Sequence, residues 1–128
     1  MPKMKPTNNQ SIYVVAICGS LREGSSTHAA LQIALSGAKD SGAEVELLQL
    51  SEYELVFQGS VANEDDYPAG VFKLREKVKR AHGILLGSPE YHGSFSGVLK
   101  SALDLMGFDD LSIRSSDSSV SPVDGWEP

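Results

Sequence analysis

The sequence is poor in cysteine, in positive charge and in long apolar runs. Its 128 residues include one cysteine, Cys18, so no disulfide can form within the chain, which fits a reducing compartment. The net charge of −6 argues against nucleic acid or an anionic membrane as a partner. The apolar run at residues 12–18 is too short to span a bilayer and lacks the layout of a signal peptide. We therefore expect a cytoplasmic protein of one domain, without nucleic-acid or membrane partners, and with a flexible N-terminus over residues 1–10.

Apolar periodicity predicts alternating strands and helices. Apolar runs predict strands at residues 12–18, 44–50 and 83–88, with the first buried on both faces and the second nearer an edge. Helical spacing of apolar residues predicts helices at residues 28–39, 71–81 and 98–106. Residues 52–70 form a long irregular stretch between them. This order predicts an α/β fold with a parallel sheet and right-handed crossovers.

The loop between the first strand and the first helix is rich in hydroxyl groups. Residues 19–27 read Gly-Ser-Leu-Arg-Glu-Gly-Ser-Ser-Thr. Ligands bind at the carboxyl end of a central strand in open α/β sheets, and a helix N-terminus attracts phosphate. Capping of the helix explains one hydroxyl, but not four hydroxyls with an arginine among them. We therefore expect a phosphate site formed by Ser20, Arg22, Ser25, Ser26 and Thr27.

This loop lacks the features that define two other phosphate-binding loops. Ser25 occupies the lysine position of a P-loop, so the clamp for the outer phosphates of a nucleoside triphosphate is missing. The Gly-x-Gly-x-x-Gly fingerprint of dinucleotide-binding loops is also absent. A loop with many hydroxyls and few charges suits a terminal monophosphate, such as that of FMN.

A second polar loop, residues 88–97, follows the third strand and reads Ser-Pro-Glu-Tyr-His-Gly-Ser-Phe-Ser-Gly. A strand order of 2-1-3 would place it beside the first loop. Tyr91 and His92 could flank a flat ring, while Gly93 and Gly97 permit close approach of the backbone. Each residue alone has a simpler explanation: Tyr91 could pack on the next helix, His92 could be exposed, and Glu90 could be solvated.

Taken together, the two loops resemble those of the NAD(P)H-dependent FMN reductase family. The matching segments are Gly19-Ser-Leu-Arg-x-Gly-Ser, Ser88-Pro-Glu-Tyr-x-Gly-Ser and Gly97-Val-Leu-Lys-Ser-Ala-Leu-Asp, within about residues 11–110. The resemblance implies a flavodoxin-like, doubly wound parallel sheet in a three-layer α/β/α arrangement, bound FMN, and a homodimer or homotetramer at full length. Thr27 and His92 stand where the family usually has asparagine. The ring of FMN would be held by Pro89, Glu90, Tyr91, His92 and Gly93.

The resemblance also implies an oxidoreductase. NAD(P)H would deliver hydride to FMN, and a small-molecule acceptor such as free flavin, a quinone, an azo compound or a metal oxyanion would take the electrons. Because the flavin performs the chemistry, we expect no catalytic residue in the chain. We also expect no metal site, since His82 lacks partners at ligand spacing and residues 64–66 lack a calcium loop. A flavin-binding electron carrier and an inactive fragment of the reductase are the alternatives.

The sequence changes character after about residue 111. A flavodoxin-like domain uses five strands, and residues 11–111 supply three. Residues 112–128 are rich in serine and aperiodic, which predicts a disordered tail foreign to the family. With one permitted choice of codons, the DNA for this segment read two bases later encodes HSVIGLVGVSGGWMGA, an apolar strand followed by a glycine loop. Our hypothesis is a C-terminally truncated or frameshifted member with a partial FMN-binding domain that retains flavin weakly, and sequencing the genomic locus tests it.

Overall fold

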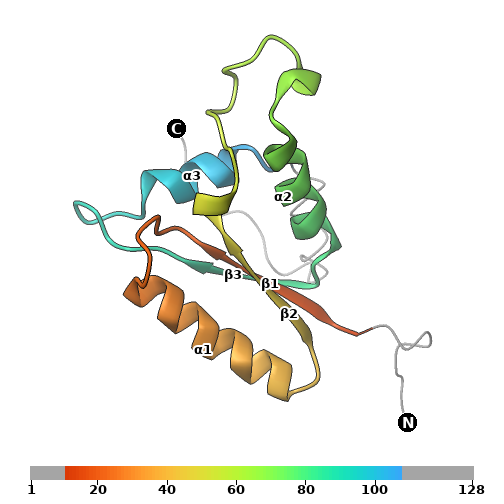
Figure 1. Cartoon of the computed structure of the whole chain (residues 1–128), viewed down its shortest axis with the longest axis vertical. Coiled ribbons are helices and arrows are strands. Elements are labelled where there is room, and N and C mark those ends of the chain that lie inside the picture. The colour runs from red at the N-terminus through yellow and green to blue at the C-terminus, as the bar shows by residue number, and fades with distance from the viewer. Residues whose placement is uncertain (1–10, 108–128) are drawn as a thin grey trace, which may run out of the picture.

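Three parallel strands form the sheet of this chain, whose computed structural model describes residues 11–107 (Figure 1). The sheet has the order β2-β1-β3, and Ala16 of the central strand lies opposite Leu47 and Leu85. This confirms the predicted order of strands and their parallel pairing. The predicted flexible N-terminus and the tail at 112–128 lie outside the described residues. The strands are β1 (Tyr13–Cys18), β2 (Glu44–Gln49) and β3 (Gly83–Gly87).

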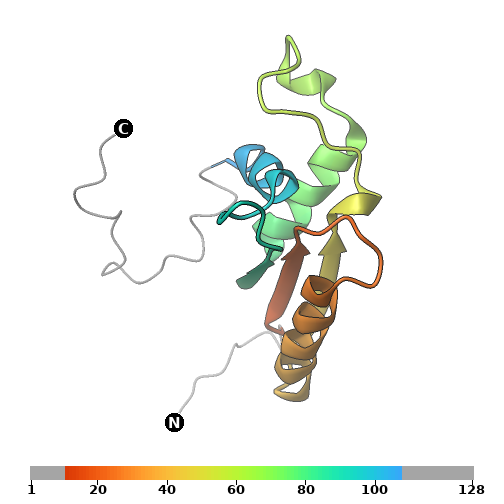
Figure 2. The same cartoon turned by 90° about the vertical axis from the view of Figure 1, so that its left-hand side faces the viewer.

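Helices cover both faces of the sheet, so the fold has three layers. Helix α1 (Ser26–Asp40) lies on one face, and α2 (Ala69–Arg80) and α3 (Gly97–Asp104) lie on the other (Figures 1 and 2). Leu31 and Leu35 of α1 form an apolar cluster with one face of β1. A larger cluster joins the opposite face to α2 and α3. The arrangement is the predicted flavodoxin-like α/β/α fold, with three strands among residues 11–107.

Strand β1 is buried on both faces, as its uninterrupted apolar sequence predicts. Ala16 and Cys18 contact the α1 side, while Val15 and Ile17 contact the α2 side, and none of the four is more than 1% exposed. The flanking strands are less covered, and Leu86 of β3 is 52% exposed. The central position of β1 therefore places its carboxyl end in the middle of the sheet.

The helices begin earlier than apolar periodicity predicts. Helix α1 begins at Ser26, two residues before the predicted start, and α2 begins at Ala69 rather than at residue 71. The first two residues of each helix are small or polar, so they carry no apolar signal although their backbone is helical. Strand β2 ends at Gln49, one residue before the predicted end, and a short 3₁₀ helix, η1 (Leu50–Glu52), follows it. The stretch predicted to be irregular, residues 52–70, contains a second one, η2 (Glu64–Asp66).

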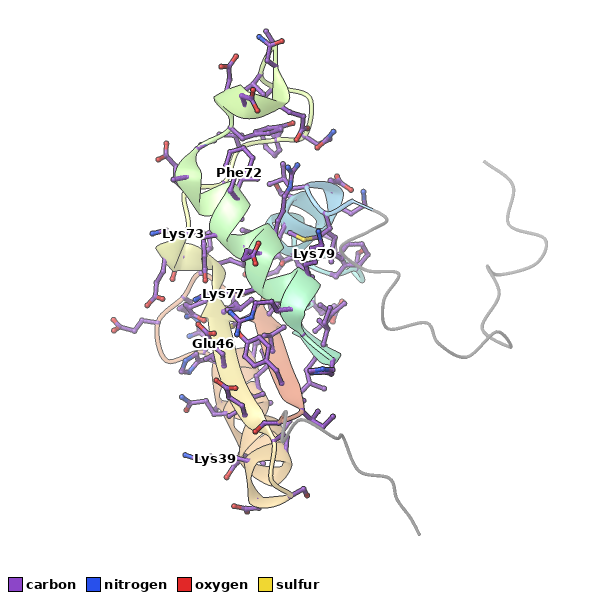
Figure 3. The ribbon with its side chains drawn as sticks, turned by 90° about the vertical axis from the view of Figure 1, so that its right-hand side faces the viewer. Lys39, Glu46, Phe72, Lys73, Lys77 and Lys79 are labelled. Carbon is purple, nitrogen blue, oxygen red and sulfur yellow. The ribbon has the colours of Figure 1, made fainter. Side chains whose placement is uncertain are left out.

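Polar contacts fix α2 to the sheet. The Tyr13 hydroxyl donates to Glu46 Oε1 at 2.6 Å, and the same carboxylate pairs with Lys77 of α2. Figure 3 shows Lys77 of α2 beside Glu46 of β2. Burial, followed by the hydrogen bond to Glu46, raises the pKa of Tyr13, so its hydroxyl stays a donor at neutral pH. No helix within residues 11–107 is both long and apolar enough to cross a membrane.

Candidate functional site

The loops that follow β1 and β3 begin side by side at the carboxyl edge of the sheet. We call residues 19–25 the first loop and residues 88–96 the second loop. Cys18 pairs with Gly87 in the last register position, and the Gly19 N–H donates to the Gly87 carbonyl at 2.8 Å. Because β2 and β3 lie on opposite sides of β1, this edge is the topological switch point where open α/β sheets bind ligands.

Gly19 lies where the two loops pack most tightly. A Cβ atom at this position would lie 2.9 Å from Leu99 Cβ, 2.9 Å from Ser96 Oγ and 3.0 Å from the Gly87 carbonyl oxygen. The two contacts of 2.9 Å are shorter than real Cβ atoms make, and neither Leu99 Cβ nor the Gly87 carbonyl is the end of a flexible side chain that could move away. Position 19 therefore requires glycine for close approach of the loops, not for an unusual φ.

Two hydroxyls of the first loop shape its backbone. Ser25 is the N-cap of α1, and its Oγ accepts a hydrogen bond from the His28 N–H at 3.0 Å. Ser20 Oγ accepts from the Arg22 N–H at 3.3 Å. Both serines are nearly buried, since Ser20 is 2% exposed and Ser25 is 3% exposed. A serine hydroxyl that accepts still has its own proton to donate, so each can serve the loop and an anion at the same time.

The first turn of α1 faces the same loop. Ser26 and Thr27 are its first two residues, and the first N–H groups of a helix have no partner within the helix. Gly24 adopts a φ of 72°, and a Cβ there would meet open space, so the turn before the helix is uncovered. Arg22 is exposed on the loop. Hydroxyls, N–H groups and a guanidinium are the donors that a phosphate needs.

The second loop contains a tight turn stabilised by its own residues. Tyr91 and Ser94 exchange two backbone hydrogen bonds, of 2.9 and 3.1 Å. His92 and Gly93 between them have φ values of 55° and 79°, and His92 is the one non-glycine residue with positive φ in the described part of the chain. The Gly93 N–H donates to Glu90 Oε2 at 2.7 Å. Glu90 is therefore not simply solvated, because its carboxylate closes this turn.

A hollow of about 440 Å³ lies between the two loops, which is a usual size for a small-molecule site. Of the predicted site residues, the structure brings Arg22 and Tyr91 together on its wall. Ser20 and Ser25 are nearly buried within the first loop and do not line the hollow. The wall also contains residues outside the predicted set, namely Gly19, Leu21, Ser96, Gly97 and Val98.

The remaining predicted residues lie beside this hollow and do not line it. Ser26 and Thr27 belong to α1, Pro89 and Glu90 precede the turn, and His92 and Gly93 form its tip. The position of Ser96 at the start of α3 could have been predicted, because a serine before Gly-Val-Leu is typical of a helix N-cap. Leu21 and Val98 carry no such signal.

A second hollow of about 460 Å³ lies beside the first loop, toward the end of β2. Glu23 and Glu52 contribute carboxylates to its wall, and Gln49 Oε1 is buried there with no hydrogen-bond partner among residues 11–107. Carboxylates repel a phosphate, so the hollow between the two loops suits an anionic ligand better.

Cys18 and the histidines form no metal centre in the described part of the chain. No group of three or more His, Cys, Asp or Glu side chains in residues 11–107 is arranged to hold a metal ion. Cys18 is fully buried, and its thiol lies 3.8 Å from the Ser20 carbonyl oxygen, to which it donates. The thiol therefore packs beneath the first loop, as expected for a cysteine that ends a buried strand.

Comparison with known families identifies the chain. Residues 12–119 match the family described as NADPH-dependent FMN reductase. The chain belongs to this family. The matched region includes the first residues of the segment 112–128, whose composition predicts a tail foreign to the family.

Curated relatives carry related names. The chain is 35% identical over 101 residues to an FMN-dependent NADPH-azoreductase of Staphylococcus saprophyticus, which covers 77% of this chain and 54% of that protein. It is 40% identical over 100 residues to an NAD(P)H-dependent FMN reductase of Pseudomonas aeruginosa, and this match covers 75% of this chain and 50% of that protein. The chain thus spans about half the length of the curated relatives that it matches.

Solved structures agree in fold. The apo form of an NADH:FMN oxidoreductase superposes with a TM-score of 0.64 at 21% identity, covering 76% of this chain and 51% of that one. The flavoenzyme NAD(P)H:(acceptor) oxidoreductase of Paracoccus denitrificans superposes with a TM-score of 0.59 at 27% identity, covering 73% of this chain and 50% of that one. The chain therefore shares the flavodoxin-like fold and covers about half of each of these solved chains.

Proposed function

We propose that this chain carries the FMN-binding loops of an NAD(P)H-dependent FMN oxidoreductase. The observation that supports this most directly is the hollow at the switch point, where Arg22 of the first loop and Tyr91 of the second meet. The whole reductase would add the residues that the longer relatives have beyond this half, and would assemble as a homodimer or homotetramer.

The first loop would hold the phosphate of FMN. Ser20 and Ser25 have hydroxyl protons to donate, Ser26 and Thr27 add hydroxyls and helix N-terminal N–H groups, and Arg22 adds the one positive charge of the loop. Ser25 keeps its cap on α1 while doing so, because capping uses a lone pair and not the proton. The donor set fits a single dianionic group.

The second loop would hold the ring. Tyr91 is 54% exposed and lines the hollow, so its ring has apolar surface available for a flat partner. Pro89, Glu90, His92 and Gly93 would act through the shape of the turn and its backbone groups, since Glu90 is already bonded to the Gly93 N–H. When bound, FMN would supply the redox chemistry, taking hydride from NAD(P)H and passing electrons to an acceptor such as an azo compound, a quinone or free flavin.

Flavin titration tests this proposal. Binding of FMN and of riboflavin to the purified chain would be followed by quenching of flavin fluorescence. We expect weak FMN binding and weaker riboflavin binding, because riboflavin lacks the phosphate. Loss of this preference in Arg22→Ala would support the phosphate assignment, and no preference in the unmodified chain would refute it.

Reduction by a nicotinamide tests the enzymatic part separately. Under anaerobic conditions, NADPH or NADH should bleach FMN bound to the chain if the nicotinamide reaches the flavin through this half of the protein. Bound FMN that neither nicotinamide bleaches would favour a flavin-binding electron carrier. A chain that binds no flavin and unfolds without cooperativity would favour an inactive fragment.

A further inference from the structure

Ser96 connects three elements of the site. Its side chain is 1% exposed, and its Oγ donates to the Gly19 carbonyl at 2.7 Å, linking residues 77 positions apart. The same Oγ accepts from the Leu99 N–H at 3.2 Å and so caps α3. Ser96 thus binds the beginning of the first loop while it fixes the helix that follows the second.

The backbone of Ser96 completes the connection within the second loop. Its N–H donates to Ser88 Oγ at 2.8 Å, and Ser88 Oγ in turn donates to the Pro89 carbonyl at 2.7 Å. Hydrogen bonds therefore run from the Gly19 carbonyl through Ser96 and Ser88 to the Pro89 carbonyl, near the start of the second loop. Gly19 and Ser96, which this chain of bonds joins, both line the wall of the hollow.

The two N-cap serines of the structure differ in one respect. Ser25 and Ser96 each accept from the N–H three residues ahead, at 3.0 and 3.2 Å. Ser96 also donates across the molecule to the other loop. Capping alone gives a serine no reason to reach the Gly19 carbonyl, so the second bond points to a separate role.

We propose that Ser96 is a positioning residue that fixes the spacing between the two loops, an inference that rests on the proposed FMN site. A ligand that covalently joins a phosphate to a ring gains from both loops together only when their separation matches its length. A ligand that occupies one loop does not depend on that separation. Ser96 would therefore favour FMN over riboflavin without contacting the phosphate.

The test compares FMN with riboflavin in the full chain and its Ser96→Ala and Ser96→Thr variants. We expect Ser96→Ala to weaken FMN binding about tenfold and riboflavin binding less than twofold. Ser96→Thr keeps a hydroxyl at the same place and should restore most of the FMN affinity. A lost helix cap alone would lower the unfolding midpoint and weaken both ligands equally, which would overturn the proposal.

Ser88→Ala provides a second test that leaves the α3 cap in place. It removes the bond that ties Ser96 to Pro89, so the preference for FMN over riboflavin should fall in the same direction. An unchanged preference in both alanine variants would reject the spacing role while leaving the FMN site intact. Absence of FMN preference in the unmodified chain would instead reject the proposed site, and the inference with it.

Discussion

The two loops of the site are built in opposite ways. The first loop lies over the central strand, and two of its hydroxyl side chains are nearly buried and bonded to backbone N–H groups. The second loop follows an edge strand of the described sheet, and Tyr91, His92 and Phe95 stand exposed on it. Buried donors with fixed partners make a preorganised anion site. Exposed aromatic residues on an edge make a surface that another part of the protein can complete.

This contrast assigns different consequences to mutations in the two loops. Loss of either buried hydroxyl of the first loop should affect stability and phosphate affinity together, because the same oxygen and proton serve both. Changes in the second loop should affect ligand affinity with less cost in stability, because its turn bonds mainly to itself. The predictions that follow run from the largest expected effect to the smallest.

Gly19→Ala should be the most damaging change. Its Cβ would lie 2.9 Å from Ser96 Oγ and Leu99 Cβ, so the loops must separate, at a cost of about 3 kcal/mol in the free energy of unfolding. Urea unfolding measures this cost. Gly37→Ala is the matched control. A Cβ at this position of α1 would have no described atom outside the helix backbone within 4 Å, so the change should raise the free energy of unfolding by about 0.5–1 kcal/mol. Equal stability of the two variants would contradict the close packing of the loops.

Arg22→Ala should weaken FMN binding with little effect on folding. Loss of a charge-assisted hydrogen bond to phosphate costs about 2 kcal/mol, or roughly thirtyfold in the dissociation constant. Lys39→Ala is the control, because it removes the same charge from the last turn of α1, at the other end of that helix from the first loop (Figure 3). Fluorescence titration measures the FMN dissociation constant of both variants. A loss in Lys39→Ala equal to that in Arg22→Ala would show a general charge effect instead of a site.

Ser25 separates the two functions of the first loop. Ser25→Ala removes the N-cap of α1 and should lower the free energy of unfolding by about 1 kcal/mol. Ser25→Asp should retain the cap and the stability, since aspartate is as good an N-cap, but its charge should repel the phosphate and abolish the preference for FMN over riboflavin. Thermal unfolding and titration of both variants measure the two effects. Normal FMN affinity in Ser25→Asp would place the phosphate elsewhere.

Glu46 tests whether a loss of stability far from the loops leaves the site unchanged. Burial alone would raise the pKa of Glu46, but hydrogen bonds from Lys77 and Tyr13 outweigh it and lower the pKa. Its stabilisation is therefore complete above the unfolded carboxyl pKa of about 4.3 and disappears as the pH falls through the lower folded value.

Glu46→Gln should accordingly destabilise the chain by about 1 kcal/mol or less at pH 7, because both partners are partly exposed. The difference from the unmodified chain should shrink below about pH 4. Urea unfolding at several pH values measures this difference in the free energy of unfolding. FMN titration at pH 7 shows whether the site is unchanged. A constant difference between pH 7 and pH 3 would contradict the ionic origin of the stabilisation.

The sequence predicts the strands and their order well, for a local reason. The continuous apolar run of β1 requires cover on both faces, and this alone places the strand at the centre. Because the strands are parallel, the loops that follow β1 and β3 must both leave the sheet at its carboxyl edge. Helix starts are predicted less well, because the first two residues of α1 and of α2 are small or polar and none of the four is buried.

The wall of the hollow was harder to predict than its position. Ser96 reaches Gly19 across 77 residues, and nothing in the local sequence of either shows that they meet. Similarly, Glu90 and Gly93 form a turn bond that depends on the positive φ of His92 and Gly93. The FMN contacts of the ten predicted site residues stay predictions, while the two loops on which those residues lie are adjacent in the structure.

The difference in affinity between FMN and riboflavin tests the central claim most directly. The account predicts that the purified 128-residue chain binds FMN at least about tenfold more tightly than riboflavin, and that Arg22→Ala removes this difference while Lys39→Ala preserves it. Equal affinities for the two flavins in the unmodified chain would contradict a phosphate site in the first loop.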